Sequence, residues 1–227
     1  MTLTKNFFLY GCATVVAFSC IAYELLLGSY ATFLMGASIF QYSLVISLMM
    51  LSMGLGALFS QRIRLNHYLT FLWVEMALAW VALLAVPLMY ISFSLNWATT
   101  PVVILFVVLL GGGIGMEIPL LSQMADSKES LPAILFSDYL GGFFGGLAFP
   151  LLLFPHLGFF SIGALLAVFN SWVSVSFLLV FAKKLTVGKR WITFLTLLTL
   201  IVCLVELKFA EDMRLALESY YFGLNRN

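Results

Sequence analysis

Four carboxylic acids lie inside long apolar runs of this sequence, where acids are unusual. They are Glu24, Glu75, Glu117 and Asp138. A lone ionised carboxylate at the middle of a bilayer costs about 2.5–3.5 kcal/mol even on a permissive insertion scale. No Lys or Arg lies in the same runs to neutralise them. Their partner must therefore be a polar side chain, water, a proton or a ligand, and we predict that the four acids bind a small cation.

Two plainer roles also fit these acids. Each side chain could extend to the membrane interface or cap a helix end. Alternatively, protonated carboxyl groups could hold helices together by hydrogen bonds, which average about 0.6 kcal/mol each in membrane proteins. In that case, replacing an acid by its amide would change stability and not transport.

The composition places these acids in a membrane protein. Of the 227 residues, 63% are hydrophobic and 9% are charged, against about 45–50% and about 25% in soluble domains. So few charges cannot cover a water-soluble enzyme, and the chain is too apolar to be disordered. A net charge of +1 provides no basic surface for nucleic acid. We predict an all-α, polytopic helix bundle in the membrane.

Seven apolar stretches approach or exceed the roughly 20 residues that a helix needs to cross a bilayer. They are residues 7–27, 38–59, 69–92, 101–121, 131–154, 158–181 and 190–206. The connections are short, so consecutive helices should be antiparallel neighbours in one membrane domain, residues 1–206. The first stretch is expected to be a retained helix, because no small-residue cleavage site follows it.

The remaining residues, 207–227, have a different pattern. Apolar residues recur there every three or four positions, with acids between them. These apolar residues are Leu207, Ala210, Met213, Leu217, Tyr220 and Leu224. The spacing predicts an amphipathic helix at the membrane interface, against a partner, or as an end-cap of the bundle.

Basic residues alternate between the connections and so predict the orientation. Eight of them fall before the first stretch or in every second connection: Lys5, Arg62, Arg64, Lys128, Lys183, Lys184, Lys189 and Arg190. The connections at 28–37, 93–100 and 155–157 have none. Cytoplasmic loops are enriched in Lys and Arg. We therefore expect a bacterial inner-membrane protein with a cytoplasmic N-terminus and a C-terminus outside.

This orientation sets the depth of the acids. Glu24 falls near the outer end of the first stretch. Glu75, Glu117 and Asp138 fall about two turns or less from the cytoplasmic ends of theirs. We expect these three to meet in one acidic pocket that faces the cytoplasm.

Glycines in the apolar stretches indicate close helix packing. They occur in the pairs Gly54 and Gly56, Gly111 and Gly115, Gly141 and Gly145, and Gly142 and Gly146. Small residues at such spacings let helix backbones approach in lipid. In the fifth stretch Pro150 and Pro155 follow, so a functional unwinding beside a cavity is the alternative. Residues 111–115 are rich in glycine, as nucleotide-binding loops are. They lack the preceding β-strand and the acidic residue that such a loop needs, so we do not interpret them as a nucleotide site.

Helix breakers follow two of the acids. Pro119 removes the backbone hydrogen bond to the carbonyl of Gly115, beside Glu117, and Gly28 follows Glu24. The two acids lie toward opposite ends of their stretches, as an inverted repeat of three helices would produce.

Cys12, Cys20 and Cys203 lie in apolar runs without metal-ligand or disulfide spacing. We expect no metal site and no cofactor.

Several short segments of this sequence form a specific resemblance. They are residues 23–28, 53–56, 116–121, 138–142, 149–150 and 155–158. In this order they resemble the N-terminal membrane region of the long, membrane-bound bacterial spermidine synthases. The resemblance implies a seven-helix membrane fold, which in that family precedes a Rossmann-like aminopropyltransferase domain. That domain binds decarboxylated S-adenosylmethionine and putrescine.

The sequence ends at Asn227, about where that catalytic domain would begin. We therefore expect a module without catalytic activity of its own, linked to polyamines. It would serve as a membrane anchor or partner for a separately encoded synthase domain. The alternative is a transporter or binding protein for a polyamine or a proton that uses the intramembrane carboxylates. The expected partners are the lipid bilayer, a synthase-domain protein and one of these cations, and not nucleic acid.

Overall fold

The described part of the chain is helical throughout and contains no strand. The computed structural model describes residues 2–63, 66–125, 130–185 and 189–224. Its long helices are α1 (Thr2–Met35), α2 (Ser38–Ser60), α3 (His67–Ser94), α4 (Thr99–Met124), α5 (Ser130–Ala148), α7 (Phe159–Phe181) and α8 (Lys189–Leu224). A π-helical turn, η1 (Phe149–Leu153), and the short α6 (Phe154–His156) follow α5. Seven segments are long and apolar enough to cross a membrane, which confirms the predicted all-α bundle.

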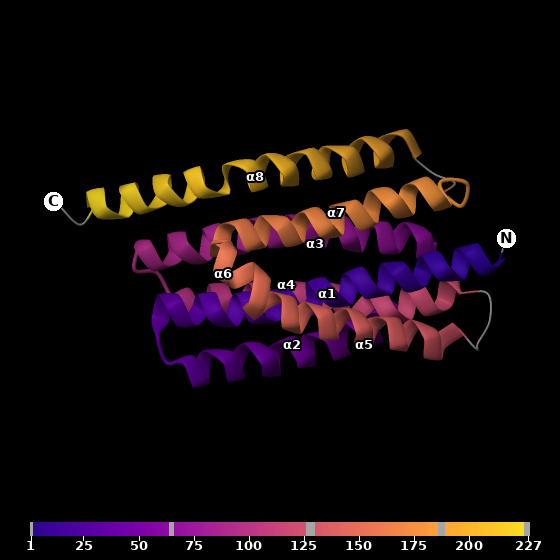
Figure 1. The fold of residues 1–227 in the computed structure, drawn as a ribbon, viewed down its shortest axis with the longest axis horizontal. Coiled ribbons are helices and arrows are strands. Elements are labelled where there is room, and N and C mark those ends of the chain that lie inside the picture. Colours follow the sequence, from indigo (N-terminus) through magenta and orange to yellow (C-terminus); the bar gives the residue numbers. More distant parts are fainter. Residues whose placement is uncertain (1, 64–65, 126–129, 186–188, 225–227) are drawn as a thin grey trace.

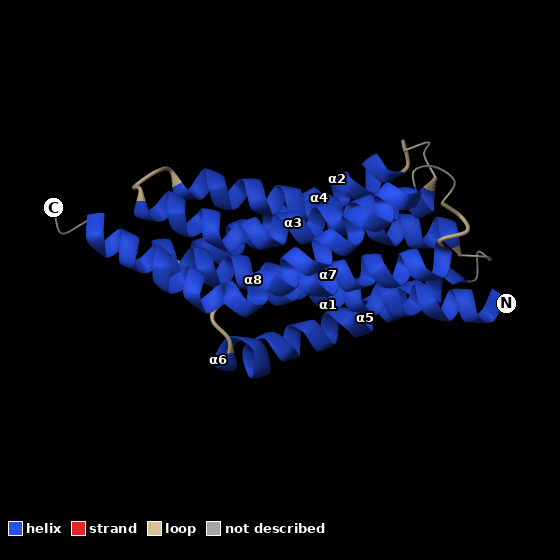
Figure 2. Cartoon of the chain, turned by 90° about the horizontal axis from the view of Figure 1, so that it is seen from above, coloured by secondary structure: helices blue, strands red, loops and turns tan. Residues whose placement is uncertain are grey.

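The long helices run side by side along the bundle axis (Figure 1). The α1 helix is central and contacts α2, α3, α4, α5 and α7. Seen from above, α2 and α5 lie at opposite sides of α1 (Figure 2), and α8 covers α7 and α3. The N-terminus and the end of α8 lie at opposite ends of the bundle. Arg64, Lys128 and residues 225–227 lie outside the described residues.

The first helix is longer than the sequence predicted. It continues through Gly28 to Met35 and ends in a turn where Gly36 and Ala37 have φ of 70° and 50°. Gly28 does not end the helix. Instead, a Cβ there would stand 2.7 Å from the ring of Tyr42, and the neighbouring hydroxyl of Ser29 hydrogen-bonds that of Tyr42 at 2.5 Å.

Some of the paired glycines make the close helix contacts that the spacing predicted, whereas a Cβ on Gly54 would meet nothing within 4 Å. A Cβ on Gly56 would lie 2.0 Å from the carbonyl oxygen of Gly112, and one on Gly115 would lie 2.0 Å from that of Met53. These contacts join α2 to α4. A Cβ on Gly141 would likewise meet the carbonyl oxygen of Thr14 at 2.0 Å, which joins α5 to α1. Only glycine allows the backbones to approach this closely.

Two prolines change the end of α5 without unwinding it. Pro150 has no N–H to donate to a helix carbonyl, and the chain forms the π-helical turn η1 there, in which the N–H of Phe154 donates to the carbonyl of Phe149. Pro155 lies in α6, and the chain then turns at Leu157 and Gly158 into α7. The backbone stays coiled, so the sequence alternative of an unwound segment is not observed.

Residues 207–224 continue α8 without a break. The helix contains 36 residues, which corresponds to about 54 Å at 1.5 Å per residue, against a hydrocarbon core of about 30 Å. The amphipathic part is therefore the second half of a long helix and not a separate element. It extends beyond the neighbouring α7 at the end of the bundle opposite the N-terminus (Figure 1).

Candidate functional site

Three of the four predicted acids lie at one level of the bundle. Glu75 is about two turns after the start of α3, Glu117 about two turns before the end of α4, and Asp138 about two turns after the start of α5. These three helix ends lie together, at the same end of the bundle as the N-terminus (Figure 1). The antiparallel order of the helices therefore brings the three acids to a common depth.

Glu75 and Glu117 form a buried pair between α3 and α4. Their exposed fractions are 0% and 1%, and the two side chains are close enough to interact directly. Both carboxyl oxygens of Glu75 and Oε2 of Glu117 are buried without a hydrogen-bond partner. Neither helix contains Lys or Arg. A proton or a bound cation is needed to balance the charge of the pair.

Glu117 also faces a cavity that it shares with Asp138. The cavity has a volume of about 680 Å³ and lies between α1, α2, α4 and α5. Asp138 is half-buried on its wall, and its charge acts on Glu117. Gly115 and Pro119 also line the cavity, so the carbonyl that proline leaves without a helix donor is on the same wall as the two acids. Most of the remaining wall is apolar.

Tyr23 lies beside the buried pair, although it was not among the predicted site residues. Its side chain is 1% exposed, its hydroxyl has no hydrogen-bond partner, and it lies near both Glu75 and Glu117. The signal for it was present, because Tyr23 is next to Glu24 in the segment of residues 23–28. Successive residues on a helix point about 100° apart. Tyr23 and Glu24 therefore point in different directions from α1, and Tyr23 is the one that lies near Glu75 and Glu117.

Glu24 is placed differently from the other acids. It is half-buried and does not line the cavity. Because α1 continues for about three turns beyond it, Glu24 lies farther from the end of its helix than the predicted boundary implied. It lies one turn after Cys20 on α1. Its part in ligand binding stays a prediction.

The side chains that line this site suit an ammonium group better than a metal ion. Among the described residues, no group of three or more His, Cys, Asp or Glu side chains is placed to hold a metal. Two carboxyl groups on an otherwise apolar wall offer hydrogen-bond acceptors for N–H donors, and the apolar wall can contact methylene groups. The arrangement can therefore hold an alkylammonium cation or a proton.

These features define a helical, membrane-type bundle with a buried acid pair beside a cavity. No family model and no solved structure matches the chain. Among curated proteins, it is similar to polyamine aminopropyltransferase of Oceanobacillus iheyensis, with 29% identity over 184 residues, which cover 78% of this chain and 36% of that protein.

Two further relatives have the same name. Polyamine aminopropyltransferase 2 of Streptomyces coelicolor is 34% identical over 187 residues, 76% of this chain and 34% of that protein. Polyamine aminopropyltransferase 2 of Aquifex aeolicus is 34% identical over 194 residues, 83% of this chain and 38% of that protein. The chain spans about a third of the length of these relatives. Homologues named for polyamine synthesis confirm that part of the resemblance seen in the sequence.

Proposed function

We propose that this chain is a membrane module of polyamine metabolism and that its cavity beside Glu117 and Asp138 binds an amine cation. The observation that carries the proposal is a buried acid pair, without a basic residue in its helices, next to a cavity that a third acid also lines. The relatives named polyamine aminopropyltransferase supply the chemical class of the ligand. Polyamines carry positive ammonium groups separated by methylene chains, which match acids on an apolar wall.

The physical reason is the low dielectric constant around the acids. Opposite charges attract far more strongly there than in water, so an ammonium group at Glu117 and Asp138 replaces the missing basic side chain. The bound cation displaces the proton that otherwise neutralises the acid pair. The same exchange allows the module to move an amine in one direction and a proton in the other.

Binding of labelled spermidine to the full chain in lipid nanodiscs tests the proposal. We expect Glu117→Gln and Asp138→Asn each to weaken binding about tenfold or more, because each removes a negative charge from the cavity. Glu206→Gln is the matched control, since Glu206 lies on α8 and does not line the cavity. Wild-type affinity in both cavity variants contradicts the proposal.

A second role is favoured by the extent of the similarity. The matched region makes up about a third of each relative, so in those proteins it accompanies a longer chain. We propose that this module likewise anchors an aminopropyltransferase domain at the membrane. Purification of the chain in mild detergent with an added synthase domain tests this role: the two should co-elute, and separate elution at every concentration contradicts it.

A further inference from the structure

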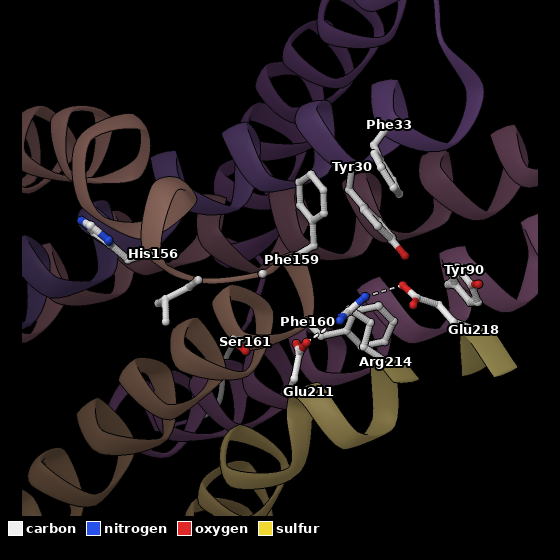
Figure 3. A pocket seen from close by; sticks show the side chains of 12 residues that line it. Tyr30, Phe33, Tyr90, His156, Phe159, Phe160, Ser161, Glu211, Arg214 and Glu218 are labelled. Carbon is white, nitrogen blue, oxygen red and sulfur yellow. Dashed lines mark hydrogen bonds and ion pairs between the residues drawn. The ribbon is translucent and has the colours of Figure 1, made fainter. Parts of the chain in front are cut away.

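A second cavity lies at the other end of the bundle, where the connections predicted to lack basic residues are found. It has a volume of about 580 Å³ and lies between the end of α1, the end of α3, the turn from α6 to α7, and the second half of α8. Figure 3 shows the side chains around it. None of these residues was part of the predicted site.

Aromatic rings form one side of this outer cavity. The ring centroid of Tyr30 lies 4.8 Å from that of Phe159 and 6.3 Å from that of Phe160. Phe33 packs on Phe159 at 5.5 Å, and Tyr90 packs on Phe160 at 6.2 Å. Faces of aromatic rings attract cations through their quadrupole.

The side of the outer cavity that α8 forms carries a net negative charge. Arg214 of α8 lies between two acids of the same helix: its Nε donates to Glu211 at 3.0 Å, and its Nη1 donates to Glu218 at 2.6 Å (Figure 3). One guanidinium group is thus shared by two carboxylates, which leaves a charge of −1. The carboxylate of Glu211 also lies beside the backbone of Gly158, at the turn into α7.

An unpaired buried hydroxyl independently indicates a ligand. Tyr30 is 1% exposed, and its hydroxyl has no hydrogen-bond partner. In Figure 3 this hydroxyl points from α1 toward Glu218 across the cavity. A buried polar group without a partner is unfavourable, so a ligand that hydrogen-bonds Tyr30 is stabilised by satisfying it.

We propose that the outer cavity is a second site for an alkylammonium cation. The ammonium group lies between Glu218 and the hydroxyl of Tyr30, and the methylene chain lies against the rings of Phe159 and Phe160. A carboxylate or phosphate is disfavoured, because Arg214 is already neutralised and an anion meets the excess negative charge. This inference rests on the proposed function for the class of ligand, and it adds a second, separate place where that ligand binds.

Protection of a single introduced cysteine tests the site. Ser161 lines the outer cavity and is partly exposed, whereas the natural Cys12, Cys20 and Cys203 are buried. In Ser161→Cys, we expect a charged thiosulfonate reagent to modify the new thiol. Spermidine should slow this reaction several-fold, and succinate at the same concentration should not.

Three variants in the Ser161→Cys background locate the ligand. Tyr30→Phe removes only one hydroxyl, and Glu218→Gln removes one charge; each should raise the spermidine concentration that gives half protection about fivefold to tenfold. Glu206→Gln should leave that concentration unchanged. Protection by succinate instead of spermidine, protection by neither, or full protection in both Tyr30→Phe and Glu218→Gln overturns the proposal.

One further variant separates this proposal from the inner site. Asp138→Asn in the Ser161→Cys background should retain protection of the cysteine by spermidine, even if it loses binding at the inner cavity. If Asp138→Asn abolishes protection as well, the outer cavity is not an independent site. If protection persists while the inner variants bind spermidine normally, the proposed inner function fails and the outer site stands.

Discussion

Three residues from three helices form a fully buried polar group in the bundle. Tyr23 of α1, Glu75 of α3 and Glu117 of α4 are all 0–1% exposed and lie near one another. Each supplies part of the polar surroundings that the others need. Asp138 is more exposed than this group and lies with Glu117 on the cavity wall.

Replacement of Glu75 tests whether this grouping is a physical unit. Glu75→Leu should raise the free energy of unfolding by about 1–3 kcal/mol, because it removes a buried carboxyl group whose two oxygens have no hydrogen-bond partner. Glu75→Gln retains hydrogen-bonding atoms at the same place and should cost about 1 kcal/mol or less. Denaturant titration in detergent measures both changes.

The same pair of substitutions at Glu24 is the control. Glu24 is half-buried and outside the cavity, so its Leu and Gln variants should differ little from each other. Equal stability of Glu75→Leu and Glu75→Gln would contradict a cost of burying the unpartnered carboxyl group of Glu75.

At the scale of the elements, glycine determines how α4 meets α2. Gly111 faces Met49 and Ser52, and Gly115 faces the backbone of Met53. Gly113 lies on another face of α4, against the side chain of Leu78 on α3. The glycines of residues 111–115 therefore make contacts with two helices, α2 and α3. A nucleotide-binding role for these residues would not explain such contacts.

A matched pair of glycines tests this contact. Gly115→Ala places a Cβ 2.0 Å from the carbonyl oxygen of Met53, so α2 and α4 must separate and the thermal unfolding temperature should fall by several degrees. Gly112→Ala meets nothing within 4 Å and should leave stability unchanged or raise it by about 1 kcal/mol, because Ala favours helix over Gly. Equal effects of the two changes would contradict the packing role.

The last helix serves two purposes along its length. Its first half is joined to neighbours by polar contacts: the indole N–H of Trp80 donates to Thr199 at 3.1 Å, and Cys203 lies 3.1 Å from the hydroxyl of Ser171. Its second half carries Glu211, Arg214 and Glu218 to the outer cavity. The first half therefore fixes where those charges lie.

For the whole molecule, the two cavities lie toward opposite ends and α1 connects them. Tyr23 belongs to the buried acid group and Tyr30 to the outer cavity, about two turns apart on one helix. Leu26 and Leu27 lie between them and are buried. A buried apolar stretch of α1 therefore separates the two.

The orientation in the membrane can be tested with two cysteine substitutions. Arg62→Cys follows α2 at the end with basic residues, and Asn96→Cys follows α3 at the other end. We expect an impermeant thiol reagent to label Asn96→Cys in intact cells and Arg62→Cys only after the cells are opened, because Lys and Arg mark cytoplasmic loops. The reverse labelling pattern would invert the proposed topology.

The sequence alone was sufficient to predict the seven apolar helices. Each requires only a long run of hydrophobic residues, which is a local property of the chain. The glycine pairs also predicted close helix contacts, since small residues at that spacing have one main use in lipid. Glu75, Glu117 and Asp138 were predicted to share a depth, because alternating helices of similar length bring residues at equal distances from their ends to one level.

Only the tertiary structure decided which faces of the helices meet. It turned Tyr23, and not Glu24, toward Glu75 and Glu117, and it packed the ring of Tyr42 against Gly28, through which α1 continues. It also brought Arg214 of α8 against Glu211 and Glu218 beside Tyr30. These outcomes depend on contacts between segments far apart in the chain, and local hydrophobicity and spacing contain no information about such contacts.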